Sequence, residues 1–563
     1  METKQIKKIG ITFCCIIVLL IVVIVGINIG RNVGGNGELT KEEAGKKLDK
    51  MINHIDANDA ELIKGDVDLA ETNLADELPE LKEEDFSVKG NGSINIEIFS
   101  SGEKAGGEGT TDGWLTDAAK EFNRGDYKVD GQSVSVSVRN ISSGLGSDYI
   151  ISGKYLPDAY TPSNSLWGDL ITAQGGDVSV FEESLVGNTA GCLLSSEKRK
   201  QIEKEYGEVS LDTIVKATVE GKLTMGYTNP LTSATGLNFL ISVLCQADAE
   251  NPLSSQAKQL FNDFQANVPY TAYTTQQMVN SAQGGSLEGM VMEYQAYIND
   301  PVLSSGYEFI PFGIRHDNPL YAVGKLSSEK QQGMNLFVNF LKSDEQQNKA
   351  KKNGFNQDKD YTASLNIDGK TIAAAQKLWK EEKDNGKPVL AVFVADVSGS
   401  MDGEPINNLK NSLINASKYI GEKNYIGLVS YANDVTINLP IAQFDLNQNS
   451  YFNGAVANLS ASGATSTYDA VMVALDMLRE AAKDIPDCKM EIFLLSDGEQ
   501  NSGYSLQDIS SILKAYKVPV YTIGYNADLT ELQKISEINE AASINAETDD
   551  VIYKLKSLFN AQM

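Results

Sequence analysis

The chain has 563 residues, too many for a single hydrophobic core, so we expect two or more domains. Its net charge of −28, from 76 acidic and 48 basic residues, argues against nucleic-acid binding, which needs a positive surface. The five cysteines form no CxxC pair, and the two histidines, His54 and His316, are too few for a His-rich site. Zinc-finger and zinc-protease classes are therefore excluded.

A long apolar segment near the N-terminus predicts a membrane anchor. Ile9 to Ile29 would span about 31 Å as a helix, which is enough for the hydrocarbon core of a bilayer. Lys4, Lys7 and Lys8 precede it, so the N-terminus is expected in the cytoplasm and the rest of the chain outside the cell. A cleaved signal peptide is the alternative, but its apolar region should be shorter and end in a small-x-small site. Residues 1–31 are assigned to a cytoplasmic tip and an uncleaved single-pass transmembrane helix.

Residues 32–92 are predicted to form an acidic stalk. Thr40 to Ile55 has a helical apolar stripe and begins with a capping box made by Thr40 and Glu43. From Asp56 to Asp85 the chain has twelve carboxylates, with only two lysines as counterions. Such a run repels itself and stays solvated, which is typical of a spacer.

Residues 93–384 alternate between strand-like and helix-like segments, which indicates a parallel sheet flanked by helices. Ile94 to Phe99 reads as a strand and is followed by a helical pattern around Trp114 and Phe122. Residues 226–236 are rich in hydroxyls and open another helix. Such a helix start can seat an anion, and plain helix capping explains the same residues equally well.

The order of motifs in this region resembles extracellular solute-binding proteins of the two-lobed, type II kind. The motifs are INIEIFSSG, PDAYTPSNSLW, GYTNPLTSATGLNFL, GMVMEYQAY and YEFIPFG, and the resemblance covers roughly residues 93–382. It implies two α/β lobes joined by paired crossover strands, with a small solute held in the cleft between them. The loops that would face this cleft contain Ser100, Ser101, Ser163, Asn229, Thr235 and Glu293.

A second α/β region begins at residue 385. Val389 to Ala395 is almost continuously apolar, as in a strand buried on both faces of a parallel sheet, and Asp396, Ser398 and Ser400 follow it directly. Ligand sites of open α/β sheets lie just beyond the carboxyl ends of the strands, where these oxygens could converge on a small divalent cation. Capping of the next helix is the alternative function of the same residues.

Two further oxygens come from separate loops of this region. Thr465 precedes a helical pattern at 467–482, and Asp497 follows the buried strand at 490–495. The order DxSxS, Gly-x-Thr and Ser-Asp-Gly resembles the von Willebrand factor A (vWA) domain over residues 385–563. One departure is Ala464, which stands where the family usually has a second glycine.

The vWA resemblance implies a metal-ion-dependent adhesion site. By position, its ligands would be Asp396, Ser398, Ser400, Thr465 and Asp497. Mg²⁺ fits such hard oxygens, and Mn²⁺ or Ca²⁺ are alternatives. The open coordination position would then take an Asp or Glu carboxylate from a protein partner.

Catalysis has little support in the sequence. A phosphotransferase of the haloacid-dehalogenase type needs a second aspartate where this chain has Ser398, and no GxSxG motif or recognisable base–nucleophile pair occurs. We therefore expect no enzyme.

The predicted fold class is α/β throughout: an N-terminal transmembrane helix, a two-lobed domain like those of periplasmic binding proteins, and a Rossmann-like, doubly wound vWA domain. The leading hypothesis is a bacterial cell-surface adhesion protein that binds a protein partner through the vWA metal. A membrane-anchored solute sensor and an assembly scaffold on the outer face of the membrane remain alternatives.

Overall fold

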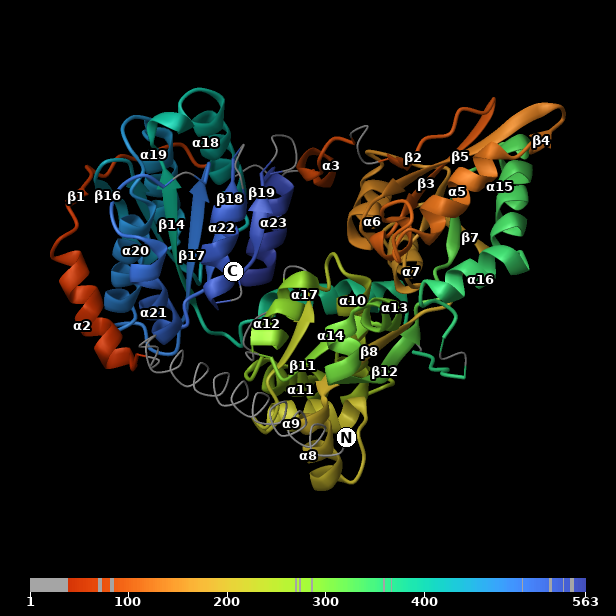
Figure 1. The fold of residues 1–563 in the computed structure, drawn as a ribbon, viewed down its shortest axis with the longest axis horizontal. Helices are drawn as coiled ribbons and strands as arrows, with labels where there is room; N and C mark the ends of the chain where they lie inside the picture. The colour runs from red at the N-terminus through yellow and green to blue at the C-terminus, as the bar shows by residue number, and fades with distance from the viewer. Residues whose placement is uncertain are drawn as a thin grey trace, which may run out of the picture.

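A computed structural model describes residues 39–68, 73–81, 86–268, 271–272, 275–284, 287–357, 360–365, 367–498, 500–525, 529–539, 541–546 and 551–563 (Figure 1). The predicted membrane anchor, Ile9 to Ile29, lies outside these residues. Within the part of the chain that is described, no helix combines the length and the apolar character needed to cross a membrane.

The first lobe of the two-lobed domain is built on a sheet with the strand order β2-β5-β3-β6-β13-β7. The apolar alternation of INIEIFS places Ile94, Ile96 and Ile98 in the core, which confirms the strand expected there. Its strands are β2 (Phe86–Val88), β3 (Ile94–Ser100), β4 (Lys128–Val129), β5 (Gln132–Asn140), β6 (Ala159–Thr161), β7 (Val178–Glu182) and β13 (Leu320–Val323). Its helices are α4 (Gly102–Ala105), α5 (Trp114–Arg124), α6 (Ser143–Ser152), α7 (Leu166–Ala173), α15 (Ser328–Leu341) and α16 (Asp344–Lys352).

The second lobe has its own sheet, with the strand order β10-β9-β11-β8-β12. Its strands are β8 (Thr189–Ser195), β9 (Met225–Thr228), β10 (Thr271–Ala272), β11 (Gly289–Glu293) and β12 (Tyr307–Arg315). Its helices are α8 (Ser196–Tyr206), α9 (Leu211–Val219), α10 (Ala234–Ala247), α11 (Ser255–Gln265), α12 (Thr275–Gly284), α13 (Tyr294–Asn299) and α14 (Pro301–Gly306). Helix α17 (Gly369–Glu382) contacts α7 of the first lobe and α10 of the second.

Two chain segments cross between the lobes side by side. One joins β7 to β8 and the other joins β12 to β13. At the crossing, Asn188 N–H donates to the His316 carbonyl at 2.9 Å and His316 N–H donates to the Asn188 carbonyl at 3.1 Å. The two lobes and their paired crossover segments are thus as the sequence resemblance implied, and we call Asn188 and His316, which pair at this crossing, the hinge residues.

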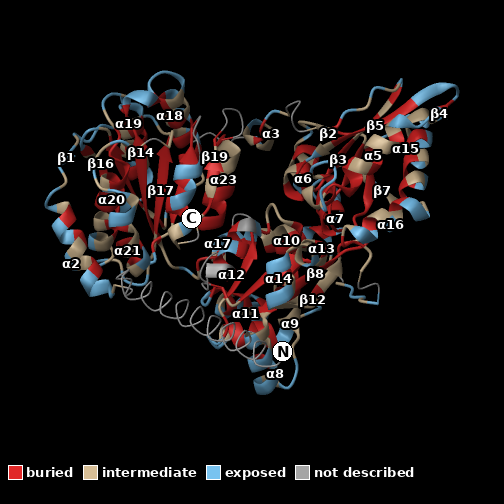
Figure 2. Ribbon diagram, in the orientation of Figure 1, coloured by how far each residue is buried: buried red, intermediate tan, exposed pale blue. Residues whose placement is uncertain are grey.

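The C-terminal domain is a doubly wound sheet with the strand order β1-β16-β15-β14-β17-β18-β19. Alternate residues of the central strand β14 (Val389–Asp396) belong to two different apolar clusters, one on each face of the sheet. The expectation of a strand buried on both faces is therefore confirmed, and Figure 2 shows β14 and β17 as buried ribbon between covering helices. The other strands are β15 (Tyr425–Tyr431), β16 (Val435–Gln443), β17 (Lys489–Ser496), β18 (Val520–Gly524) and β19 (Ser543–Asn545). The helices are α18 (Glu404–Ser417), α19 (Leu446–Ala457), α20 (Thr467–Ala481), α21 (Leu506–Tyr516), α22 (Leu529–Ser536) and α23 (Val551–Gln562), with short 3₁₀ turns η2 (Gly399–Met401) and η3 (Glu537–Asn539).

The predicted acidic stalk is corrected by the structure, because much of it packs on the C-terminal domain. Helix α2 (Lys41–Ile52) has the expected capping box, and its apolar stripe, Ala44, Leu48 and Met51, is buried against α20 and α21. Strand β1 (Ala57–Asp59) then adds to the edge strand β16 (Figure 1). The reason is that an edge strand offers unpaired backbone groups, which an extended segment can satisfy whatever its charge. A further short helix, α3 (Leu74–Glu77), follows.

The junction between the two domains contains buried charges. Lys383 and Asp384 are almost fully buried and form an ion pair of 2.8 Å, and Lys489, at the start of β17, lies 3.1 Å from the same carboxylate. Glu491 is buried next to them, and burial raises the pKa of its carboxyl to about 8 although Lys489 and Lys383 lower it. The chain thus enters the C-terminal domain through a segment whose charged side chains are buried and paired.

We expect the Glu491→Gln variant to lose less stability than the parent between about pH 5 and about pH 9. The folded pKa of Glu491 lies above its ordinary value of 4.5, so the stability it contributes is complete below that value and is lost as the pH rises through about 8. The melting temperature measured across this range tests it. Exposed Glu404 provides the control, because Glu404→Gln makes the same charge change and should follow the parent. Parallel profiles for the parent and Glu491→Gln would refute the expectation.

Candidate functional site

Asp396 lies at the carboxyl end of the central strand β14 and is fully buried. Its Oδ1 accepts a hydrogen bond from Ser398 N–H at 2.9 Å. Its Oδ2 accepts bonds from the Ser496 hydroxyl at 2.6 Å and the Tyr431 hydroxyl at 3.1 Å. These donors come from the neighbouring strands β17 and β15, so the sheet itself fixes the orientation of the carboxylate.

The first two predicted metal loops are joined directly. Gly399 N–H donates to the Gly463 carbonyl at 3.0 Å, and the hydroxyls of Ser398 and Ser400 lie 3.0 Å apart. Ser398 is buried and Ser400 is exposed. Thr465, in the second loop, is buried, and its N–H donates to Asn501 Oδ1 at 2.8 Å.

The departure at Ala464 does not disturb the second loop. Gly463 has a φ of +86°, a conformation that strongly favours glycine, whereas Ala464 is not among the residues with positive φ. Ala464 N–H is held by Asn433 Oδ1 at 2.8 Å. The one glycine that this loop needs for its turn is therefore present.

The third loop places a second carboxylate near the first. Asp497 follows β17 directly and is half-buried. Burial raises the pKa of Asp396, hydrogen bonds from Ser398 and Ser496 lower it, and the charge of Asp497 raises it again. None of these main influences is a basic side chain. A cation bound at the loops would therefore offset both the cost of burying the Asp396 charge and its repulsion from Asp497.

The donor set fits a small hard cation. Two carboxylates and nearby hydroxyl oxygens suit Mg²⁺, which keeps several waters and takes one or two carboxylates. Among the described residues, no three or more His, Cys, Asp or Glu side chains lie close enough together to hold a metal, so that part of the chain offers no carboxylate-rich cage. Metal binding by Asp396, Ser398, Ser400, Thr465 and Asp497 stays a prediction, made on three loops that the fold brings together.

Sequence reasoning missed the residues that support this site. Ser496 could have been found, since it directly precedes Asp497 at the end of a buried strand. Tyr431 and Asn501 have no local signal, because they reach the loops only through sheet pairing and loop packing.

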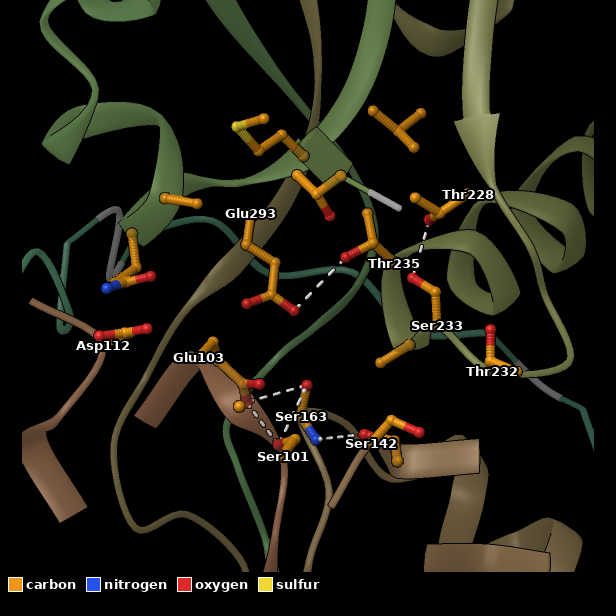
Figure 3. A pocket seen from close by; sticks show the side chains of 18 residues that line it. Ser101, Glu103, Asp112, Ser142, Ser163, Thr228, Thr232, Ser233, Thr235 and Glu293 are labelled. Atoms are coloured by element: carbon orange, nitrogen blue, oxygen red, sulfur yellow. Dashed lines mark hydrogen bonds between the residues drawn. The ribbon is translucent and has the colours of Figure 1, made fainter. Parts of the chain in front are cut away.

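The two-lobed domain holds a second candidate site, a cavity of about 350 Å³ between the lobes (Figure 3). Of the predicted cleft residues, Ser101, Ser163, Thr235 and Glu293 line it. Ser100 and Asn229 do not. The Ser100 hydroxyl donates to the Ser101 carbonyl at 3.2 Å, and Asn229 Oδ1 accepts Leu231 N–H at 2.9 Å. Both side chains therefore form hydrogen bonds within their own loops. Lining residues that the sequence analysis did not single out include Glu103, Asp112, Ser142, Ser143, Ser233 and Gln295.

Glu293, at the end of β11, is bonded to both hinge residues. Its Oε1 lies 2.7 Å from His316 Nδ1, and its Oε2 accepts a bond from Asn188 Nδ2 at 2.9 Å. The Thr235 hydroxyl lies 3.4 Å from Oε1. Glu293 therefore connects the cavity lining to the two residues that pair where the chain crosses between the lobes.

The hydrogen bonds around His316 determine its tautomer. Its Nε2 faces the amide nitrogens of Asn164 at 3.0 Å and Asn238 at 3.1 Å. The orientation of these amides is set by their oxygens, which accept the N–H groups of Leu166 and Ile314. Two amide donors make Nε2 an acceptor, so the proton resides on Nδ1 and is donated to Glu293.

Comparison with known protein families agrees with this geometry. Residues 106–356 match the family "Bacterial extracellular solute-binding protein", and residues 391–561 match "von Willebrand factor type A domain". The chain thus carries a solute-binding protein domain followed by a vWA domain.

Relatives share only part of the chain. An uncharacterised protein of Synechocystis sp. is 27% identical over 166 residues, covering 28% of this chain and 38% of that protein. Bovine inter-alpha-trypsin inhibitor heavy chain H3 is 28% identical over 153 residues, covering 25% of this chain and 17% of its own length. A solved putative extracellular solute-binding protein from Bordetella parapertussis is 14% identical, with a TM-score of 0.35, and covers 52% of this chain and 99% of its own. The matched region therefore spans less than half of these two sequence relatives.

Proposed function

We propose that this protein binds a protein partner at the bacterial cell surface through a divalent cation on its vWA domain. The observation that carries the proposal is the meeting of three loops around Asp396, a buried carboxylate with hydroxyls beside it and the like charge of Asp497 nearby. The vWA match supports a protein-binding role.

The proposed ligands are Asp396, Ser398, Ser400, Thr465 and Asp497, directly or through water. When bound, Mg²⁺ would supply an electrophilic position for a partner's Asp or Glu carboxylate. The protein's own part is to hold and orient these oxygens, and we propose no catalytic step. The match to an extracellular family supports a location outside the cytoplasm. Anchoring by a single N-terminal helix, with the N-terminus inside, is part of the proposal.

A pull-down from native surface extract with the full-length chain tests this function. We expect a protein to be retained in Mg²⁺ and released by excess chelator, because the partner's carboxylate would bind through the ion. Retention that is equal with Mg²⁺ and with chelator would defeat the metal-dependent proposal, even if the partner were specific.

A second function, solute sensing, is favoured by the bonds from Glu293 to both hinge residues. The vWA helix α23 also contacts the second lobe, where Gln562 Nε2 donates to the Thr271 carbonyl at 2.9 Å. Since β10 pairs with β9, whose Thr228 lines the cavity, cleft closure could alter the presentation of the vWA domain. This proposal predicts that some small molecule raises the melting temperature of the domain.

A further inference from the structure

The cleft contains a donor set of the kind that proteins use to hold oxyanions. Three donors converge on one position, which is occupied by Glu103 Oε1. The Ser101 hydroxyl donates to this oxygen at 2.6 Å and the Ser163 hydroxyl at 2.9 Å, and the Lys104 ammonium donates to it at 3.1 Å. Ser101, Ser163 and Lys104 are almost fully buried. Hydroxyls and a buried ammonium that converge in this way form a strong site for a negatively charged oxygen.

Here the protein fills that position with its own carboxylate. Burial raises the pKa of Glu103, but the Lys104 ammonium and the Ser101 hydroxyl lower it further, so its pKa lies below the ordinary value and the group is ionised. An oxyanion from solution would have to displace this carboxylate and then remain next to it. Repulsion between the two charges would oppose binding.

The opposite lobe presents a second carboxylate to the same space. Figure 3 shows the carboxylate of Glu293, from β11, directed toward the side of the cavity on which Glu103, from α4, lies, whereas the Glu103 carboxylate is directed toward Ser101 and Ser163. Glu293 accepts the Nδ1 proton of His316, and Asp112 adds a third carboxylate to the lining. No lysine, arginine or histidine is found among the described residues that line the cavity. Lys104 lies behind the lining, with its ammonium bonded also to the Ser101 hydroxyl and the Thr161 carbonyl.

The hydrogen bonds from Ser101, Ser163 and Lys104 all go to Oε1 of Glu103, and none of the three goes to Oε2. Serine and threonine side chains supply most of the remaining polar lining, and no aromatic ring is among the lining residues in the described part of the chain. A cage for a quaternary ammonium would need such rings. The cavity of about 350 Å³ is at the small end of ligand sites.

We propose that the cleft takes a small hydrophilic amine, whose ammonium group lies between Glu103 and Glu293, and that Glu103 makes the cleft reject oxyanions. The proposal rests on the solute-binding function proposed above and names its ligand class. A primary ammonium has three donors, which matches two carboxylates from opposite lobes together with a hydroxyl. A ligand held in this way would link the two lobes through Glu293 and thus the hinge.

Thermal shift and calorimetry on the full-length chain test the proposal with two sets of probes. Ethanolamine, 1,4-diaminobutane and lysine carry the ammonium, whereas sulfate and phosphate are the oxyanions. We expect at least one amine to raise the melting temperature and neither oxyanion to do so. Glu293→Gln should weaken the amine by about tenfold or more, since it removes one partner of a buried charge pair. Glu103→Ala should weaken the amine and gain binding of sulfate in the vacated position.

Exposed Glu108 provides the matched control, because Glu108→Ala removes a nearby carboxylate that does not line the cavity. Sulfate or phosphate binding to the parent would overturn the ligand class while leaving solute binding in place. Failure of all three amines would overturn the ligand class too, and a wider neutral-solute library would then decide the solute-binding function separately. If Glu103→Ala does not fold, two measurements still test the ligand class: the preference of the parent for amines over oxyanions, and the amine affinity of Glu293→Gln.

Discussion

Replacing Asp396 with alanine is expected to abolish Mg²⁺-dependent capture of the protein partner. Asp396 is the only proposed ligand that is a fully buried carboxylate, and its orientation is fixed by three hydrogen bonds from Ser398, Ser496 and Tyr431. Without it, Asp497 would be the only carboxylate left to neutralise the cation. Mg²⁺ should then no longer raise the melting temperature, whereas for the parent a concentration of 100 times the dissociation constant stabilises by about 2.7 kcal/mol.

The control for this variant is Asp402→Ala, which removes an exposed carboxylate from the segment just after the first loop. It should bind the partner and Mg²⁺ as the parent does. The Asp396→Ala variant should still unfold cooperatively, since alanine removes a buried charge together with its bonds. Partner capture by Asp396→Ala at the parent's level, with Mg²⁺ present, would contradict the metal site.

The His316→Ala variant is expected to destabilise the two-lobed domain by about 3 kcal/mol or more. The imidazole is fully buried, donates to Glu293 and accepts from Asn164 and Asn238. Alanine would leave a cavity, two amide donors without their acceptor and a carboxylate with one donor fewer. Chemical denaturation followed by far-UV circular dichroism measures the loss.

The chain's other histidine is a natural control. His54 is exposed, and its Nδ1 lies 2.6 Å from the Lys50 carbonyl one helical turn earlier, so His54→Ala should change the stability by about 0.5 kcal/mol or less. Equal, small effects of the two substitutions would show that the bonds around His316 contribute little. In that case the hinge would be held by its backbone pairing alone.

Several elements could be predicted because their signal lies within one segment. The capping box at Thr40 and Glu43, the doubly buried strand that ends at Asp396 and the helix that starts at Thr467 all lie where the sequence placed them. The strand expected at 490–495 extends one residue further at each end, from Lys489 to Ser496. Periodicity identifies an element more reliably than its ends, since the end depends on which backbone bonds a neighbour supplies.

The predicted stalk failed for a related reason. Its composition indicated a charged segment, but composition does not reveal that an edge strand elsewhere has backbone groups to share. The parallel pairing of Ala57 with Val435, 378 positions later in the sequence, is a property of the assembled sheet. Helix α2, in the same stretch, buries its apolar stripe while its charged residues face solvent, so a highly charged composition does not exclude packing.

The sequence by itself determined that the chain has two α/β domains of recognisable kinds and which oxygens follow their strands. Only the tertiary structure decided which of those oxygens share a site. In the folded chain the hydroxyls of Tyr431 and Ser496 donate to Asp396. In the cleft, Glu103 accepts a bond from Ser163, and Glu293 accepts one from the hinge residue Asn188. The physical reason is that these contacts join residues far apart in the chain, whose meeting depends on strand order and lobe packing and leaves no local pattern.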